Sequence, residues 1–187
     1  RHGAELLVMG LTGYTDTRDR IFGEVADQVI RQSPCDLALL KVGNPELPKR
    51  CLFPTAGGAN AQLAAEMLNT LAPALGMEVT ACYVVKPNAT EGERNEAYGW
   101  IDQTVKQLDS TIQIERKLIE ARSIAAGIAK ESREYDLVVL GAAREPFLRQ
   151  VMFGEIPEKV ARYSSASVLV VKRYEGRVRS LLKRAFG

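Results

Sequence analysis

Residues 136–173 read DLVVLGAAREPFLRQVMFGEIPEKVARYSSASVLVVKR, and residues 5–42 read ELLVMGLTGYTDTRDRIFGEVADQVIRQSPCDLALLKV. The two stretches align without a gap at a constant offset of 131 residues. The matched positions pair Gly10 with Gly141, Phe22, Gly23 and Glu24 with Phe153, Gly154 and Glu155, Val29 with Val160, Arg31 with Arg162, and Lys41 with Lys172. Each copy reads as a strand, a glycine loop, a helix and a second strand. The repeat therefore indicates two copies of one β-α-β unit.

From residue 50 onward, strand and helix patterns alternate. Strands are predicted at Cys51–Pro54, Glu78–Val85, Ile112–Leu118, Asp136–Leu140 and Val168–Val171. Helices are predicted at Ala61–Leu75, Ala97–Leu108, Ile124–Ser132 with Ser123 as N-cap, and after Gly154, and Pro87–Asn95 reads as a loop. This order predicts an α/β fold with a doubly wound, open, parallel five-stranded sheet.

The first copy predicts the β-α-β end of a second domain of the same kind, with strands at Glu5–Met9 and Leu37–Val42 around a helix at Ile21–Gln32. We therefore divide the chain into an incomplete unit at 1–43, a linker rich in glycine and proline at 44–49, a complete domain at 50–173, and a tail at 174–187.

Composition excludes several classes of function. The net charge is only +2, which does not indicate binding to nucleic acid. The single histidine is His2, so neither a histidine metal site nor a Ser-His-Asp triad is expected. Cys35, Cys51 and Cys82 show no metal-ligand spacing, and this odd count indicates a reducing compartment. We interpret Cys51 and Cys82 as small apolar residues inside strands.

The spacing inside the repeat resembles that of the universal stress protein family. Residues 141–155 read Gly, two residues, Arg144, nine residues, Gly154 and Glu155. The family pattern is Gly-x2-Gly-x9-Gly-Ser/Thr between the fourth strand and fourth helix. The turn Cys-Leu-Phe-Pro-Thr-Ala-Gly-Gly after residue 50 and the strand Val168–Val171 are also similar to its first and fifth strands. The resemblance covers residues 50–173 and 4–43, and it implies an adenine nucleotide alpha hydrolase-like fold.

The resemblance also implies a site for ATP or another adenine nucleotide, in which backbone N–H groups and a helix N-terminus hold the phosphates. Carried onto this chain, the candidate nucleotide-binding residues lie in the loops after the first and fourth strands and beside them: Pro54, Thr55, Ala56, Gly57, Val84, Leu140, Gly141, Arg144, Gly154, Glu155 and Ile156. No catalytic residue and no metal ligand is expected, since the sequence supplies neither a general base nor a set of ligands.

Four positions depart from the family pattern. Ala56 stands in place of an aspartate, Arg144 in place of the second glycine, Glu155 in place of Ser/Thr, and Pro157 in place of a following hydroxyl residue. A carboxylate at a helix N-terminus is stabilised by the helix dipole, so Glu155 can occupy the anion position itself. Arg144 either compensates by binding phosphate or pairs with Glu155 and closes the pocket. We expect a degenerate pocket that has lost ordinary ATP binding.

Two features keep alternative interpretations. Tyr83 ends the second strand of the complete domain, either as a packing aromatic or as a contact for a base. The tail carries Val178, Leu181, Leu182, Ala185 and Phe186 at helical spacing, flanked by Arg177, Arg179, Lys183 and Arg184. Such a basic amphipathic helix binds an anionic membrane surface or a partner, or packs on its own domain.

By resemblance, the chain is expected to be a non-catalytic regulatory or assembly module, the cytosolic domain of an amino acid, cation or chloride transporter in the same polypeptide. It would lie in the cytoplasm, at the cytoplasmic face of the membrane. The alternative is a stand-alone sensor of ATP, AMP or a cyclic dinucleotide in a stress response. Self-association is expected through the fifth strands, with Leu37–Val42 pairing edge to edge with Val168–Val171.

Overall fold

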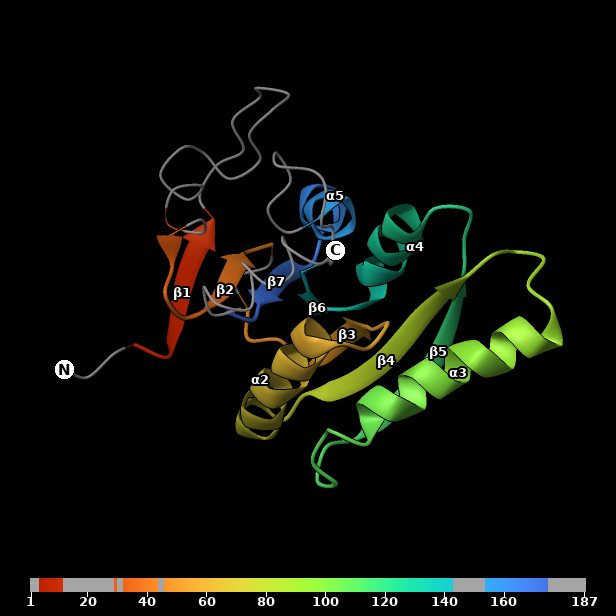
Figure 1. The fold of residues 1–187 in the computed structure, drawn as a ribbon, viewed down its shortest axis with the longest axis horizontal. Coiled ribbons are helices and arrows are strands. Elements are labelled where there is room, and N and C mark those ends of the chain that lie inside the picture. The colour runs from red at the N-terminus through yellow and green to blue at the C-terminus, as the bar shows by residue number, and fades with distance from the viewer. Residues whose placement is uncertain (1–3, 12–28, 30–31, 44–45, 143–153, 175–187) are drawn as a thin grey trace, which may run out of the picture.

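The structure is a computed structural model that describes residues 4–11, 29, 32–43, 46–142 and 154–174. A seven-stranded sheet forms its centre, in the order β1-β2-β7-β6-β3-β4-β5 (Figure 1). The strands are β1 Leu6–Leu11, β2 Asp36–Lys41, β3 Arg50–Pro54, β4 Glu78–Val85, β5 Ile114–Glu120, β6 Leu137–Gly141 and β7 Ser167–Lys172. All neighbours run parallel except β2 and β7, which are antiparallel. The predicted α/β class and parallel order are confirmed.

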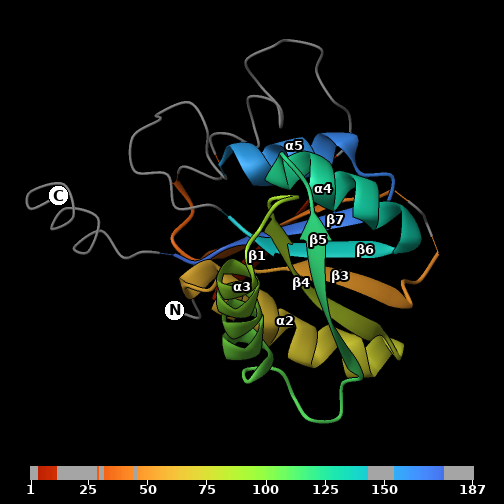
Figure 2. The same ribbon diagram turned by 90° about the vertical axis from the view of Figure 1, so that its right-hand side faces the viewer.

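Helices cover both faces of the sheet, as a doubly wound fold requires. The helices are α2 Ala59–Leu75, α3 Glu91–Val105, α4 Ile124–Glu131 and α5 Glu155–Tyr163, with a 3-10 turn at Ser132–Glu134. Figure 2 shows α2 and α3 on one face and α4 and α5 on the other. Each face has its own apolar core. Leu68 and Phe53 lie in the core under α2, and Ile128 and Val160 lie in the core under α4 and α5.

The interval 87–95 is not a loop throughout, and this prediction is wrong. Helix α3 begins at Glu91 with Thr90 as its N-cap. The Thr90 hydroxyl accepts a hydrogen bond from the Glu93 N–H, and the Glu93 carboxylate accepts one from the Thr90 N–H at 2.7 Å. This reciprocal capping box satisfies two amides that would otherwise lack partners, so it starts the helix six residues before its first buried residue, Ala97.

The predicted pairing between Leu37–Val42 and Val168–Val171 is present within the chain. In the antiparallel register of β2 and β7, Leu39 faces Val170, which is its own counterpart in the repeat. The flanking contacts repeat in the same way. The Gly43 N–H donates to the Ser167 hydroxyl at 3.1 Å, and the Tyr174 N–H donates to Asp36 Oδ1 at 2.6 Å. A local two-fold axis therefore passes between the two copies.

Several predicted features lie outside the described residues. They include most of the helix at Ile21–Gln32, the positions of Phe22, Gly23 and Glu24, Arg144, and the tail beyond Tyr174. Over the part of the chain that is described, no helix combines the length and apolar character needed to cross a bilayer.

Candidate functional site

The sheet order places a site between β3 and β6. The chain passes from β3 to β4 on one side, while β6 lies on the other, so the strand order reverses at β3. Ligands in open α/β sheets bind at the carboxyl ends of strands beside such a reversal. A cavity of about 520 Å³ opens there. This volume falls in the range of pockets for small organic ligands.

Four groups of elements build the cavity wall. The turn after β3 and the start of α2 contribute Pro54, Thr55, Ala56, Gly57, Gly58, Ala59, Asn60 and Ala61; β4 contributes Cys82, Tyr83 and Val84; the end of β6 contributes Leu140, Gly141 and Ala142; and the helices contribute Trp100, Ile124, Ile128, Ile156 and Pro157. None of these described lining residues carries a charged side chain. The pocket is therefore mainly apolar, with polar groups on its backbone and on the side chains of Thr55, Asn60, Tyr83, Trp100 and Cys82.

Most of the candidate residues from the sequence come together in this wall. Pro54, Thr55, Ala56, Gly57, Val84, Leu140, Gly141 and Ile156 all line the cavity. Gly154 and Glu155 lie at the N-terminus of α5 and do not line the cavity. Arg144 lies outside the described residues. Tyr83 lines the cavity and is half-buried, a position compatible with both of its interpretations.

The turn after β3 needs its glycines. Gly57 and Gly58 have φ values of 75° and 87°, in the region that side chains with a Cβ rarely adopt. Thr55 is buried, and its hydroxyl accepts a bond from the Gly57 N–H and shares one with the Thr104 hydroxyl at 2.8 Å. Thr55 therefore ties the turn to α3, and its hydroxyl is already used in holding the turn.

Gly141 is required by the close approach of α2. A Cβ at this position would lie 2.7 Å from the backbone carbon of Asn60 and 3.0 Å from the Ala61 nitrogen. Asn60 then fixes the crossing, because its Nδ2 donates to the Ala142 carbonyl and its Oδ1 accepts from the Arg173 N–H. The N-terminus of α2 is thus held against the carboxyl ends of β6 and β7. This helix has no side-chain cap, so its first N–H groups stay available at the pocket.

The N-terminus of α5 has different electrostatics. Glu155 and Glu158 occupy its first turn, and Pro157 supplies no N–H. The Glu155 side chain is 61% exposed and forms an ion pair with Lys159 one turn along the helix. The predictions that this carboxylate fills the anion position or pairs with Arg144 stay predictions, because Arg144 lies outside the described residues. The two acids still place negative charge where the helix dipole favours a bound anion.

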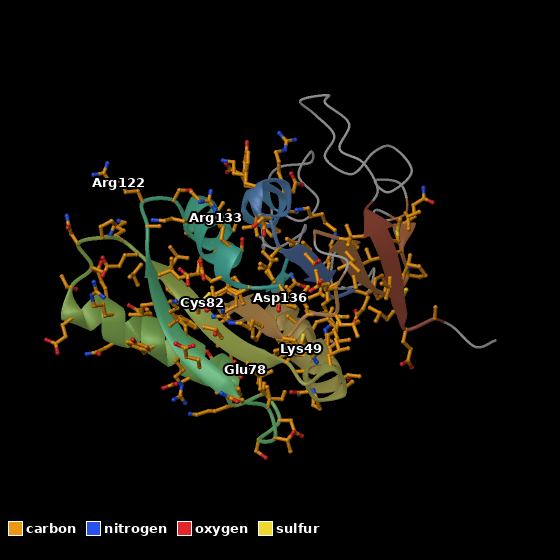
Figure 3. The ribbon with its side chains drawn as sticks, turned by 180° about the vertical axis from the view of Figure 1, so that it is seen from behind. Lys49, Glu78, Cys82, Arg122, Arg133 and Asp136 are labelled. Carbon is orange, nitrogen blue, oxygen red and sulfur yellow. The ribbon has the colours of Figure 1, made fainter. Side chains whose placement is uncertain are left out.

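Asp136 has a structural role away from the cavity. Asp136 Oδ2 accepts the N–H groups of Lys49 and Arg50 at 2.8 Å each, which joins the amino ends of β6 and β3. Figure 3 shows Lys49, Glu78 and Asp136 near the starts of their strands, with Cys82 in the interior and Arg122 at the far edge of the molecule. Among the described residues, no cluster of His, Cys, Asp and Glu could hold a metal ion.

The interpretation of Cys51 and Cys82 as apolar strand residues is confirmed. Both are fully buried, in β3 and β4. Burial raises the pKa of the Cys51 thiol to about 12 and also raises the pKa of the Cys82 thiol. Cys82 borders the cavity as a neutral thiol, which is a poor nucleophile at neutral pH.

Sequence reasoning missed Asn60, Trp100, Ile124 and Ile128. Trp100 is the single tryptophan of the chain, and its ring packs over the turn, 3.4 Å from a Cβ built at Gly57. Asn60 had a usable signal, since it is a polar residue in the first turn of a helix that follows two glycines. The other three lie on α3 and α4, whose distance from the turn in sequence gave no signal.

The comparisons with known proteins agree with this geometry. The model of the universal stress protein family matches residues 1–41 and 48–172. The chain belongs to this family. Among curated proteins, the Na(+)/H(+) antiporter NhaS5 of Synechocystis sp. is 26% identical over 171 residues, or 89% of this chain. The chain spans only 24% of the length of that antiporter.

Solved universal stress proteins share the fold. One from Archaeoglobus fulgidus DSM 4304 superposes with a TM-score of 0.66 at 18% identity, over 91% of this chain and 62% of that chain. A universal stress protein in complex with cAMP gives 0.58 at 16% identity, over 69% of this chain and all of that one. Another from A. fulgidus, in complex with dAMP, gives 0.52 at 12% identity, over 68% and 100% of the two chains.

Proposed function

We propose that this chain is a non-catalytic regulatory module that binds an adenine nucleotide chiefly through its nucleoside. The observation that carries the proposal is the apolar, ligand-sized cavity at the reversal of strand order, with one uncapped helix N-terminus beside it. The solved relatives in complex with cAMP and dAMP support a monophosphate as the ligand class. The absence of charged side chains from the described wall supports a binding role over a catalytic one.

The two helix N-termini indicate which phosphates of the ligand would contribute to binding affinity. The end of α2 offers N–H groups to one phosphate, whereas the end of α5 carries Glu155, Glu158 and Pro157. A triphosphate extending toward α5 would meet negative charge and one donor fewer. We therefore expect the second and third phosphates to add no affinity, which is the sense in which this pocket is degenerate.

A titration of Trp100 fluorescence tests this proposal, because the single tryptophan forms part of the wall. Adenosine, AMP, cAMP and ATP are compared, with thermal shift as a second readout. We expect AMP and cAMP to bind at least as tightly as ATP. No fluorescence change and no thermal stabilisation with any of the four at millimolar concentration would refute nucleotide binding, and ATP binding tenfold tighter than AMP would refute the degenerate pocket.

A matched pair of variants separates the role of Glu155 from a general charge effect. Glu155→Ser restores the hydroxyl of the family pattern and removes the carboxylate, so ATP affinity should rise roughly fivefold while adenosine affinity stays constant. Glu158→Ser removes a charge from the same turn of α5 and should have a smaller effect. Equal effects of the two variants would show that the motif position has no special role.

We further propose that the module belongs to a cation transporter and acts at the cytoplasmic face of the membrane. The antiporter relative supports this, since it aligns with 89% of the chain. In a chimera, this chain replaces the matching quarter of the Synechocystis antiporter, and Na⁺/H⁺ exchange is measured in inverted vesicles. We expect exchange to persist and to respond to AMP, and the response to disappear when Gly57→Val closes the turn. Exchange that ignores AMP would contradict a regulatory role.

A specific observation favours the second candidate, a stand-alone nucleotide sensor. The relatives in complex with cAMP and dAMP are matched over their full length, so nothing beyond this fold is needed in those proteins. In that case the chain would bind the same ligands and the chimera would not respond to them. The two candidates therefore differ in the chimera experiment and agree in the titration.

A further inference from the structure

Two large apolar side chains of the cavity wall are exposed to solvent. Trp100 on α3 is 38% exposed, and Ile124, the first residue of α4, is 47% exposed. Among the described residues, these two are the large exposed apolar side chains that also line the cavity. A single exposed apolar side chain needs no explanation, but two that border one ligand-sized cavity provide apolar surface that a ligand can bury.

The two side chains reach the cavity from opposite faces of the sheet. Helix α3 lies on the same face as α2, and α4 lies on the other face with α5 (Figure 2). Trp100 therefore belongs to one helical layer and Ile124 to the other. A flat group that enters the cavity between the two layers would bury apolar surface on both of its sides.

Trp100 is held in position against the turn after β3. Its ring lies 3.4 Å from a Cβ built at Gly57, and its carbonyl accepts a hydrogen bond from the Thr104 hydroxyl at 3.2 Å. The Thr104 hydroxyl is also bonded to that of Thr55, and the neighbouring Ile101 is fully buried. The segment of α3 that carries the ring is thus fixed to the turn, so this part of the wall is preorganised for a ligand.

The polar side chains of the turn are already committed within the protein. The Thr55 hydroxyl joins the turn to α3, and both polar atoms of the Asn60 side chain bond to backbone groups that follow β6 and β7. Ala56 contributes only a methyl group to the wall. The side chains around Trp100 therefore offer a ligand mainly apolar surface, which favours recognition of a planar ring by stacking.

We propose that Trp100 recognises the base of the bound nucleotide by stacking on one side of its ring system, while Ile124 packs against the other side. This inference rests on the proposed function, because it requires a nucleotide in this cavity. A purine has two fused rings and covers more of the Trp100 ring than a pyrimidine does, so stacking selects purine nucleotides over pyrimidine nucleotides. Trp100 is thereby a specificity-determining residue of the site.

Calorimetric titration with AMP and with CMP tests the inference, because the two ligands share the ribose and the phosphate and differ in the base. In the original chain we expect AMP to bind about tenfold more tightly than CMP. Trp100→Ala should weaken AMP binding by about tenfold and reduce the preference for AMP to below about threefold. The ratio of the two affinities is the decisive readout, since a merely distorted turn would weaken both ligands alike.

Three further variants complete the test. Trp100→Phe keeps a smaller stacking surface and should give an intermediate ratio, which decides the matter if Trp100→Ala binds neither nucleotide measurably. Ile124→Ala should weaken AMP binding by about threefold. Tyr98→Ala is the matched control, because Tyr98 is an aromatic residue on the same helix that is 41% exposed and does not line the cavity. It should leave both affinities within about twofold of the original values.

Three results would overturn the inference. An AMP to CMP ratio that is the same in the original chain and in the Trp100 variants would reject base stacking on this residue while leaving nucleotide binding intact. Equal effects of Tyr98→Ala and Trp100→Ala would assign the loss to α3 as a whole. Failure of both AMP and CMP to bind the original chain would refute the proposed function and the inference together.

Discussion

The pair β1–β2 and the pair β6–β7 come from the same sequence pattern, and they meet symmetrically where Leu39 faces Val170. They differ in their outer neighbours. Strand β6 is flanked by β3 and covered by α2, so Leu137–Leu140 is buried on both faces. Strand β1 lies at one edge of the sheet that the described residues form, and it keeps one apolar face exposed. The repeated sequence therefore specifies two strands and the axis that relates the copies. The burial of its first strand depends on a neighbouring strand and helix, which for β6 are β3 and α2.

The largest expected effect contrasts the two glycines in the original chain. Gly141→Val should lower the free energy of unfolding by about 3 kcal/mol, because the new side chain collides with the backbone of Asn60 and Ala61. Gly10→Val should change it by less than about 0.5 kcal/mol. Urea denaturation measures both. Equal losses of unfolding free energy in the two variants would show that Gly10 is packed as closely as Gly141.

A second contrast compares buried and exposed valines. Val139→Ala removes methyl groups from a fully buried position, so a loss of about 2–3 kcal/mol is expected. Val8→Ala removes them from a side chain that is 57% exposed and should cost less than about 0.5 kcal/mol. A loss at Val8 above 1.5 kcal/mol in urea denaturation would mean that this face is already covered in solution.

Alkaline pH should lower the free energy of unfolding, because the buried thiols of β3 and β4 stay protonated in the folded chain. Cys51 has a pKa near 12 when folded, raised by burial from 9.0, so above pH 9 the unfolded chain loses a proton that the folded chain keeps. Stability should therefore fall as pH rises, by about 1.4 kcal/mol between pH 9 and 10 for this thiol at most. Cys51→Ala should flatten the slope of unfolding free energy against pH. An unchanged slope would exclude the thiol as its source.

The smallest expected effects concern the contacts that repeat across the axis. Asp36→Ala removes the acceptor for the Tyr174 N–H and a partly exposed ion pair with Arg173, and should cost about 1.2 kcal/mol. Ser167→Ala removes the acceptor for the Gly43 N–H and should cost about 0.5–1 kcal/mol. Thermal unfolding ranks the two. The reverse ranking would show that the charge on Asp36 contributes little.

How well each element could be predicted depended on whether its residues show a long apolar pattern. The strand Glu78–Val85, which has a long apolar pattern, was predicted at its observed bounds, whereas the strand predicted at Ile112–Leu118 lies at Ile114–Glu120. Helix α3 was predicted to begin at Ala97 instead of Glu91, because its apolar residues at helical spacing, Ala97, Ile101 and Val105, lie in its second half. Its start depends on the capping box of Thr90 and Glu93, which is polar and local.

The residues of the candidate site also fall into those that the sequence predicts and those that only the fold brings to the cavity. The loops after β3 and β6 were found from glycine spacing, since a glycine that permits a turn or a close approach leaves a mark in the sequence. Trp100 and Ile124 come from helices that the tertiary fold brings across the turn, and their spacing in sequence carries no information about that contact. The ion pair between Glu155 and Lys159 is an i,i+4 contact within α5, so it follows from the sequence once the helix is placed.

By itself, the sequence determined the duplicated unit and the alternation of strands and helices, because periodicity and turn chemistry are local properties of the chain. The pairing of like strands was expected from the resemblance to the family. Only the tertiary structure decided that Leu137 and Val139 are buried while Leu6 and Val8 are exposed. Identical patterns allow either outcome, since burial depends on the neighbouring strand and helix. Those neighbours come from elsewhere along the chain.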